Sequence, residues 1–167
     1  MIEEINKCVN VLQNGGLIVY PTDTVWGIGC DATNPEAVQK VYALKKREVS
    51  KPLVCLVANQ AMLERHVKEV PDVAYDIMDF ATKPTTIVFD QPLGVADNLV
   101  AADNTLGIRV ASDKFCQYLI NKFRKPIVST SANISGKITP KQFKDIDEEI
   151  LKGVDYVVNL QNENYTP

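Results

Sequence analysis

Hydroxyl and carboxylate side chains follow the first apolar run of the chain. Leu17 to Tyr20 predicts a buried strand, and Pro21 should end it because proline donates no hydrogen bond to a sheet. The next segment holds two threonines around a carboxylate, the only tryptophan and two glycines: Thr22, Asp23, Thr24, Trp26, Gly27 and Gly29. Hydroxyls beside a rigid aromatic ring can bind a small polar molecule. An ordinary turn after a strand is the alternative, and these residues alone leave both readings open.

A second segment concentrates positive charge. Lys45, Lys46, Arg47 and Lys51 fall within seven residues, just before an apolar run from Pro52 to Ala58 that predicts a strand. Lysine and arginine bind phosphate oxygens, so this segment can grip a polyphosphate. The alternative is a solvated helix end, which is the usual meaning of a charge run.

A third segment is rich in hydroxyls. Ser129, Thr130, Ser131 and Asn133 follow the strand predicted at 126–128. Sheets of α/β proteins bind ligands beyond the carboxyl ends of their strands, and backbone N–H groups there can hold an anion. A polar turn is again the alternative. If one nucleotide needs both cations and hydroxyls, Lys45 and Arg47 should lie near Ser131 and Asn133 in one cavity.

Other kinds of site are disfavoured. The chain has neither a GxxxxGK[ST] motif nor a complete GxGxxG motif. His66 is the only histidine, which argues against a Ser-His-Asp triad. Four widely spaced cysteines without a CxxC pair indicate neither a zinc site nor a disulfide framework. The remaining chemistry is the positioning of anions, as in phosphoryl and nucleotidyl transfer.

Composition narrows the class of protein. A length of 167 residues fits one domain, and 46% apolar with 23% charged residues is typical of a globular protein. The net charge of -3 argues against the basic surface that binding to duplex nucleic acid requires. Neither a run of transmembrane length nor a signal-peptide pattern is present, so we expect a cytoplasmic protein.

Predicted helices and strands alternate along the chain. Helical spacing or capping signals occur over 2–12, from an Asn34 cap to 45–47, over 59–66 and 73–80, from a Ser112 cap to 123, and over 139–150. Strands are predicted at 17–20, 52–58, 85–89, 106–110, 126–128 and 156–160, with an irregular loop over 90–105. This alternation predicts an α/β domain with a twisted sheet covered by helices.

Three segments in this order resemble the threonylcarbamoyl-AMP synthase family, the YrdC-like proteins. They are 16–53, with PTDTVWGIG, Lys45-x-Arg47 and Ser50-Lys51-Pro52-Leu53; 107–110, with Gly-Ile-Arg-Val; and 129–136, with Ser-Thr-Ser-Ala-Asn-Ile-Ser-Gly. The resemblance implies a twisted mixed β-sheet flanked by helices, with a concave, positively lined cavity, in a single YrdC-like domain over 1–167.

The resemblance also implies a reaction. L-Threonine, bicarbonate and ATP, the last with Mg²⁺, would give threonylcarbamoyl-AMP and pyrophosphate, without a metal site of the protein itself. The product would feed the machinery that makes threonylcarbamoyladenosine in tRNA, with at most weak RNA contact and no membrane. An RNA-binding or nucleotide-binding paralogue without this activity is the alternative.

Residue roles follow only from the family match. Facing threonine and its carbamate would be Thr24, Arg109 and Ser129. The nucleotide would be faced by Lys45, Arg47, Ser50, Lys51, Thr105, Ser131, Asn133 and Thr139. The catalytic set among them would be Lys45, Arg47, Ser131 and Asn133.

Two stretches depart from the family pattern. Residues 82–86 keep only Pro84 and Thr86 of a Pro-Gly-Pro-x-Thr stretch, which weakens the expectation of nucleotide contacts there. The family commonly continues with a Pro-Ser-Thr strand. If Pro167 begins that strand, the sheet is one strand short.

Overall fold

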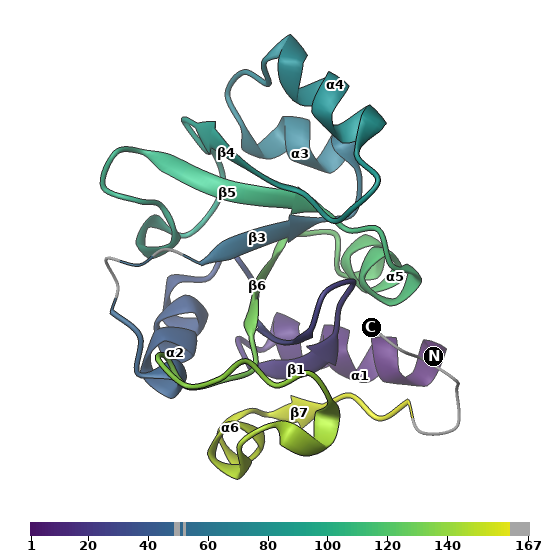
Figure 1. Ribbon diagram of the computed structural model, residues 1–167, viewed down its shortest axis with the longest axis vertical. Helices are drawn as coiled ribbons and strands as arrows, with labels where there is room; N and C mark the ends of the chain where they lie inside the picture. Colours follow the sequence, from purple (N-terminus) through teal and green to yellow (C-terminus); the bar gives the residue numbers. More distant parts are fainter. Residues whose placement is uncertain (49–50, 52, 161–167) are drawn as a thin grey trace.

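The computed structural model describes residues 1–48, 51 and 53–160. Its sheet has the strand order β4-β5-β3-β6-β2-β1-β7 and mixes parallel with antiparallel pairs (Figure 1). The strands are β1 (Ile18–Pro21), β2 (Trp26–Gly29), β3 (Val54–Val57), β4 (Thr86–Asp90), β5 (Thr105–Val110), β6 (Ile127–Ser131) and β7 (Tyr156–Val157).

Helices surround this sheet, as the alternating pattern predicted. They are α1 (Ile2–Gln13), α2 (Pro35–Lys45), α3 (Gln60–His66), α4 (Asp72–Phe80), α5 (Lys114–Phe123) and α6 (Glu148–Gly153), with short 3₁₀ turns η1 (Asp97–Leu99) and η2 (Phe143–Asp145). Helix α1 packs against α5, α2 lies on the other side of β6, and α3 and α4 lie above β3, β5 and β4 (Figure 1). In the described part of the chain, every helix is too short or too polar to cross a membrane.

Two asparagines start helices as predicted. Asn34 accepts a hydrogen bond from the backbone N–H of Ala37 at the start of α2, and Asn59 does the same for Met62 in α3. The predicted cap of α5 is wrong by one residue, because Asp113 rather than Ser112 caps this helix. The Ser112 hydroxyl instead donates to the buried carboxylate of Asp23.

Strand β2 was not predicted. Pro21 does not stop the sheet but ends β1 opposite Trp26, and β2 then pairs antiparallel with both β1 and β6. The glycines of β2 serve close packing rather than an unusual backbone angle, since neither has a positive φ. A Cβ atom on Gly29 would lie 2.6 Å from Cε1 of the buried Tyr20 ring.

The helix predicted over 139–150 is also wrong. The segment forms η2 and then the short helix α6, whose first turn is capped by the Asp147 side chain. Ile146 and Ile150 are buried as predicted. Phe143 is partly exposed and packs edge-on against Trp26, with ring centroids 5.1 Å apart.

The close approach of Gly29 to Tyr20 gives a stability prediction. Gly29→Ala should lower the free energy of unfolding by about 1–3 kcal/mol, because the new methyl group overpacks the hairpin. Calorimetry should show a smaller loss when Gly29→Ala is made in a Tyr20→Leu background, where the ring is absent. Equal losses in the two backgrounds would contradict this packing account.

Candidate functional site

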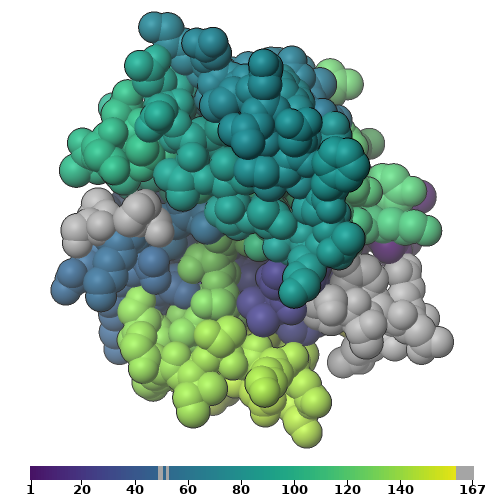
Figure 2. All heavy atoms as spheres, turned by 45° about the horizontal axis from the view of Figure 1, so that its top comes forward, coloured from purple at the N-terminus to yellow at the C-terminus, as the bar shows by residue number. Residues whose placement is uncertain are grey.

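A cavity of about 320 Å³ opens where β6 parts from β3. Strand β3 pairs with β6 only as far as Val54 opposite Ser129, whereas β2 continues to pair with Thr130 and Ser131. The side of β6 that has lost its neighbour faces the cavity. The lining residues are Thr22, Thr24, Val25, Gly27, Arg47, Leu53, Val54, Arg109, Ser129, Thr130 and Ser131. In the space-filling view, the teal region of α3 and α4 overhangs the yellow-green region near α6 (Figure 2).

The turn between β1 and β2 is held by Thr22. Its buried hydroxyl accepts from the backbone N–H groups of Thr24 and Val25 at 3.1 and 3.2 Å, and donates to the Val25 carbonyl at 2.6 Å. The Thr24 hydroxyl lies 3.1 Å from that of Thr22. Since the single Thr22 proton goes to a carbonyl, Thr24 must be the donor of this pair. Its remaining lone pairs can accept a hydrogen bond from a ligand.

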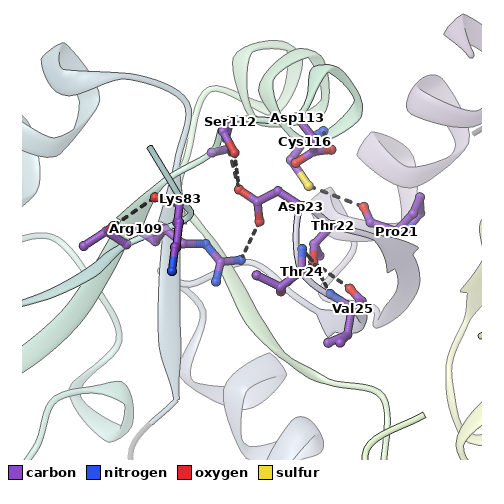
Figure 3. Close-up of polar contacts among 12 residues, drawn as sticks. Pro21, Thr22, Asp23, Thr24, Val25, Lys83, Arg109, Ser112, Asp113 and Cys116 are labelled. Atoms are coloured by element: carbon purple, nitrogen blue, oxygen red, sulfur yellow. Dashed lines mark hydrogen bonds and ion pairs between the residues drawn. The ribbon is translucent and has the colours of Figure 1, made fainter. Parts of the chain in front are cut away.

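An arginine stands beside this turn. Arg109 projects from β5, and its Nη2 lies 3.1 Å from Oδ1 of Asp23 (Figure 3). Both side chains are largely buried, with exposed fractions of 11% and 7%. The other oxygen of Asp23 accepts from the hydroxyl and the backbone N–H of Ser112. Among the described residues, Nε and Nη2 of Arg109 and Oδ1 of Asp23 have no hydrogen-bond partner, so the contact between the two side chains is an ion pair.

Lys45 lies behind the cavity wall rather than in it. This last residue of α2 is 1% exposed, and its ammonium donates to the Ser131 carbonyl at 2.5 Å and to Oδ1 of Asn133 at 3.3 Å. Ser131 also donates its hydroxyl to Oδ1 of Asn133. Burial, with a smaller effect of nearby Arg47, lowers the pKa of Lys45 to about 8. Lys45 therefore ties the end of α2 to the end of β6.

Arg47 reaches the cavity because α2 ends sharply. Lys46 adopts a left-handed conformation with φ of 53°, and the N–H of Arg47 bonds back to the Tyr42 carbonyl. Nε of Arg47 donates to the carbonyl of Lys51 at 2.9 Å. The expected closeness of Lys45 to Ser131 and Asn133 is confirmed by their hydrogen bonds. The expectation that all four residues face one cavity is confirmed only for Arg47 and Ser131, because Lys45 and Asn133 are not in its lining.

The structure brings together part of the residue set implied by the family match. The residues of this set in the cavity lining are Thr24, Arg47, Arg109, Ser129 and Ser131. Asn133 lines a neighbouring cavity of about 480 Å³, formed with the segment from Gly136 to Pro140.

Three other residues of that set lie elsewhere. Thr105 begins β5 and donates to Asp103; at about 3.3 Å per residue it is roughly 13 Å along the strand from Arg109. Lys51 and Thr139 are exposed and outside the cavity lining. Ser50 lies outside the described residues.

Sequence reasoning assigned no role to several residues of this site. Leu53 and Val54, at the start of β3, supply an apolar wall of the cavity. The sequence alone does not show that they lie beside it. Asp23 was recognised as a carboxylate between threonines, but its contact Ser112 is 89 positions away. Only the fold makes that contact visible. The described residues contain no group of three or more His, Cys, Asp or Glu side chains placed to hold a metal ion.

Sequence comparisons place the chain among known proteins. Residues 10–166 match the model of the Sua5/YciO/YrdC family, which is described as "Telomere recombination". A relative from Methanocaldococcus jannaschii is 37% identical over 169 residues, which is 98% of this chain and 79% of the relative. The threonylcarbamoyl-AMP synthase of Photobacterium profundum is 31% identical over 153 residues, covering 89% of this chain and 82% of its own.

Solved structures agree with these matches. The crystal structure of P. abyssi Sua5 complexed with L-threonine has a TM-score of 0.86 and 28% identity over 93% of this chain. This chain spans 46% of that protein, which is about half its length. The E. coli YciO structure has a TM-score of 0.80 and 25% identity, and covers 92% of this chain and 75% of its own. With nearly its whole length matched, this chain belongs to the Sua5/YciO/YrdC family.

Proposed function

We propose that this chain is an L-threonylcarbamoyladenylate synthase, a nucleotidyltransferase that uses L-threonine, bicarbonate and ATP. One observation carries the proposal: the Thr24 hydroxyl, Arg109, Arg47 and the serines of β6 line a single cavity. The name of the Photobacterium profundum relative and the L-threonine complex of P. abyssi Sua5 support it. The product would serve tRNA modification in the cytoplasm.

The proposed reaction joins two anions. The threonine amine and bicarbonate give a carbamate and water, and a carbamate oxygen then attacks the α-phosphorus of ATP. The bond from the α-phosphorus to the bridging oxygen breaks, and pyrophosphate leaves. Because both partners are negatively charged, the chain must supply positive charge and fixed hydrogen-bond donors. Mg²⁺ would enter with ATP as part of the substrate.

Each side of the cavity fits one substrate. Arg109 offers its guanidinium to the threonine carboxylate, and Thr24 accepts a hydrogen bond from the threonine ammonium or hydroxyl. Arg47 binds phosphate oxygens through its planar fork, and the Ser129 and Ser131 hydroxyls lie between the two substrates. Lys45 acts from behind, by fixing the Ser131 carbonyl and Asn133.

The first prediction tests the function itself. Pyrophosphate release from MgATP should require both L-threonine and bicarbonate, and threonylcarbamoyl-AMP should form in equal amount. The measurement is product chromatography with each substrate omitted in turn. ATP or RNA binding without threonine-dependent release would instead support a binding paralogue and overturn the synthase.

The second prediction concerns Arg47. Arg47→Lys keeps the charge but loses the fork that matches phosphate oxygens, so kcat/KM for ATP should fall tenfold or more, about 1.4 kcal/mol. Arg65→Lys, made on the exposed surface of α3, is the matched control and should not change kcat/KM. Near-parental activity of Arg47→Lys would mean that only bulk charge matters at this position.

The third prediction concerns Thr24. Thr24→Val is nearly isosteric and removes the acceptor. The fall in kcat/KM for threonine should correspond to about 1–3 kcal/mol of lost transition-state stabilisation, with little change in Tm. Thr33→Val removes a hydroxyl bonded to Asp31 outside the cavity, and should leave the threonine dependence unchanged. A well-folded Thr24→Val enzyme with parental threonine dependence would remove Thr24 from the site.

A further inference from the structure

Asp23 makes contacts that the turn around it does not need. The turn is closed by the Thr22 hydroxyl, which bonds to Thr24 and to both backbone groups of Val25. The Asp23 carboxylate points out of the turn (Figure 3). Its two oxygens go to Arg109 on β5 and to Ser112 in front of α5. Because the Asp23 carboxylate does not stabilise its own turn, its role lies in the contacts with Arg109 and Ser112.

The contact with Asp23 restricts Arg109. A free arginine side chain samples many rotamers, and holding it before a ligand arrives reduces the entropy lost on binding. Asp23 forms an ion pair with Nη2 at 3.1 Å, while Nη2 and Nε both remain without a hydrogen-bond partner among the described residues. Ser112 fixes the carboxylate in turn, with its hydroxyl at 2.6 Å. These contacts restrict the orientations in which the arginine meets the cavity.

Asp23 also changes the charge at this end of the cavity. The pair of Arg109 and Asp23 is neutral overall, so it offers directed donors without a net positive field. A carboxylate ligand can still bind the directed donors of the guanidinium. A phosphate with two negative charges relies more on net positive charge, and Asp23 cancels most of the attraction that Arg109 alone would give it.

We propose that Asp23, itself held by Ser112, is a positioning and specificity residue: it orients Arg109 for the amino-acid carboxylate and keeps phosphate away from that end. This inference rests on the proposed function, in which Arg109 binds threonine. It predicts that the two anionic substrates are sorted by local charge compensation as well as by shape.

Asp23→Asn tests both parts, because it keeps the shape and removes the charge. At saturating ATP, the variant should raise KM for threonine about tenfold or more, with little change in KM for ATP. Inorganic phosphate should also become competitive with threonine in the variant, and should not be competitive in the parent protein. Product chromatography follows the reaction in the presence of phosphate.

Two further variants separate positioning from folding. Ser112→Ala keeps the Asp23 charge and should raise KM for threonine a few-fold without phosphate competition. Ser112→Thr keeps a hydroxyl and should have the threonine KM of the parent protein. Asp31→Asn is the matched control, since Asp31 is a buried carboxylate paired with Lys125 outside the cavity lining. It should lower Tm and leave both the threonine KM and the phosphate response unchanged.

The outcomes decide between the two proposals. A threonine KM within twofold of the parent in Asp23→Asn, or a lower Tm with no phosphate competition, would overturn the role of Asp23. Calorimetric titration with L-threonine alone provides a second readout. A parent that binds threonine without turnover, and an Asp23→Asn variant that binds it more weakly, would support Asp23 while overturning the synthase. If the parent is active and Asp23→Asn binds L-threonine as tightly as the parent does, only the inference about Asp23 is overturned.

Discussion

The site depends on a buried ammonium. Removing the charge of Lys45 from water is costly, so its hydrogen bonds to the Ser131 carbonyl and to Asn133 must be kept. Those two bonds fix the end of β6 against the end of α2, and the left-handed Lys46 then turns the chain so that Arg47 enters the cavity. A residue that lines no part of the cavity thus sets the geometry of the side that we propose binds phosphate.

On the opposite side of the cavity, the buried positive charge of Arg109 is compensated differently. Arg109 is also largely buried, but its charge is met by the carboxylate of Asp23 rather than by neutral acceptors. A lysine among carbonyl and amide oxygens leaves a positive field, whereas an arginine beside a carboxylate leaves directed donors with little net charge. The contrast suits a reaction in which one substrate carries a polyphosphate and the other a single carboxylate.

Local signals predicted much of the fold. Asn34 and Asn59 mark the starts of α2 and α3 because capping depends on residues only a few positions apart. Other signals were ambiguous. Ser112 and Asp113 are both good caps, and only the buried partner of Ser112 decides between them. Helical spacing found α4, yet Phe80 is 82% exposed, because spacing identifies a helix and not what covers it.

The site depends on strand register, which no local signal contains. Ser129 and Ser131 share one face of β6 because side chains alternate, and a slip by one residue would turn both hydroxyls to the opposite face. The pairs Val54–Ser129 and Gly27–Ser131 set this register, and the buried Tyr20 hydroxyl bonds to the Val128 carbonyl at 3.1 Å. Tyr20 fits there because β2 carries glycine beside its ring. The glycines after the first turn therefore make room for a ring whose hydroxyl bonds to β6, the strand a hundred residues later that carries the cavity serines.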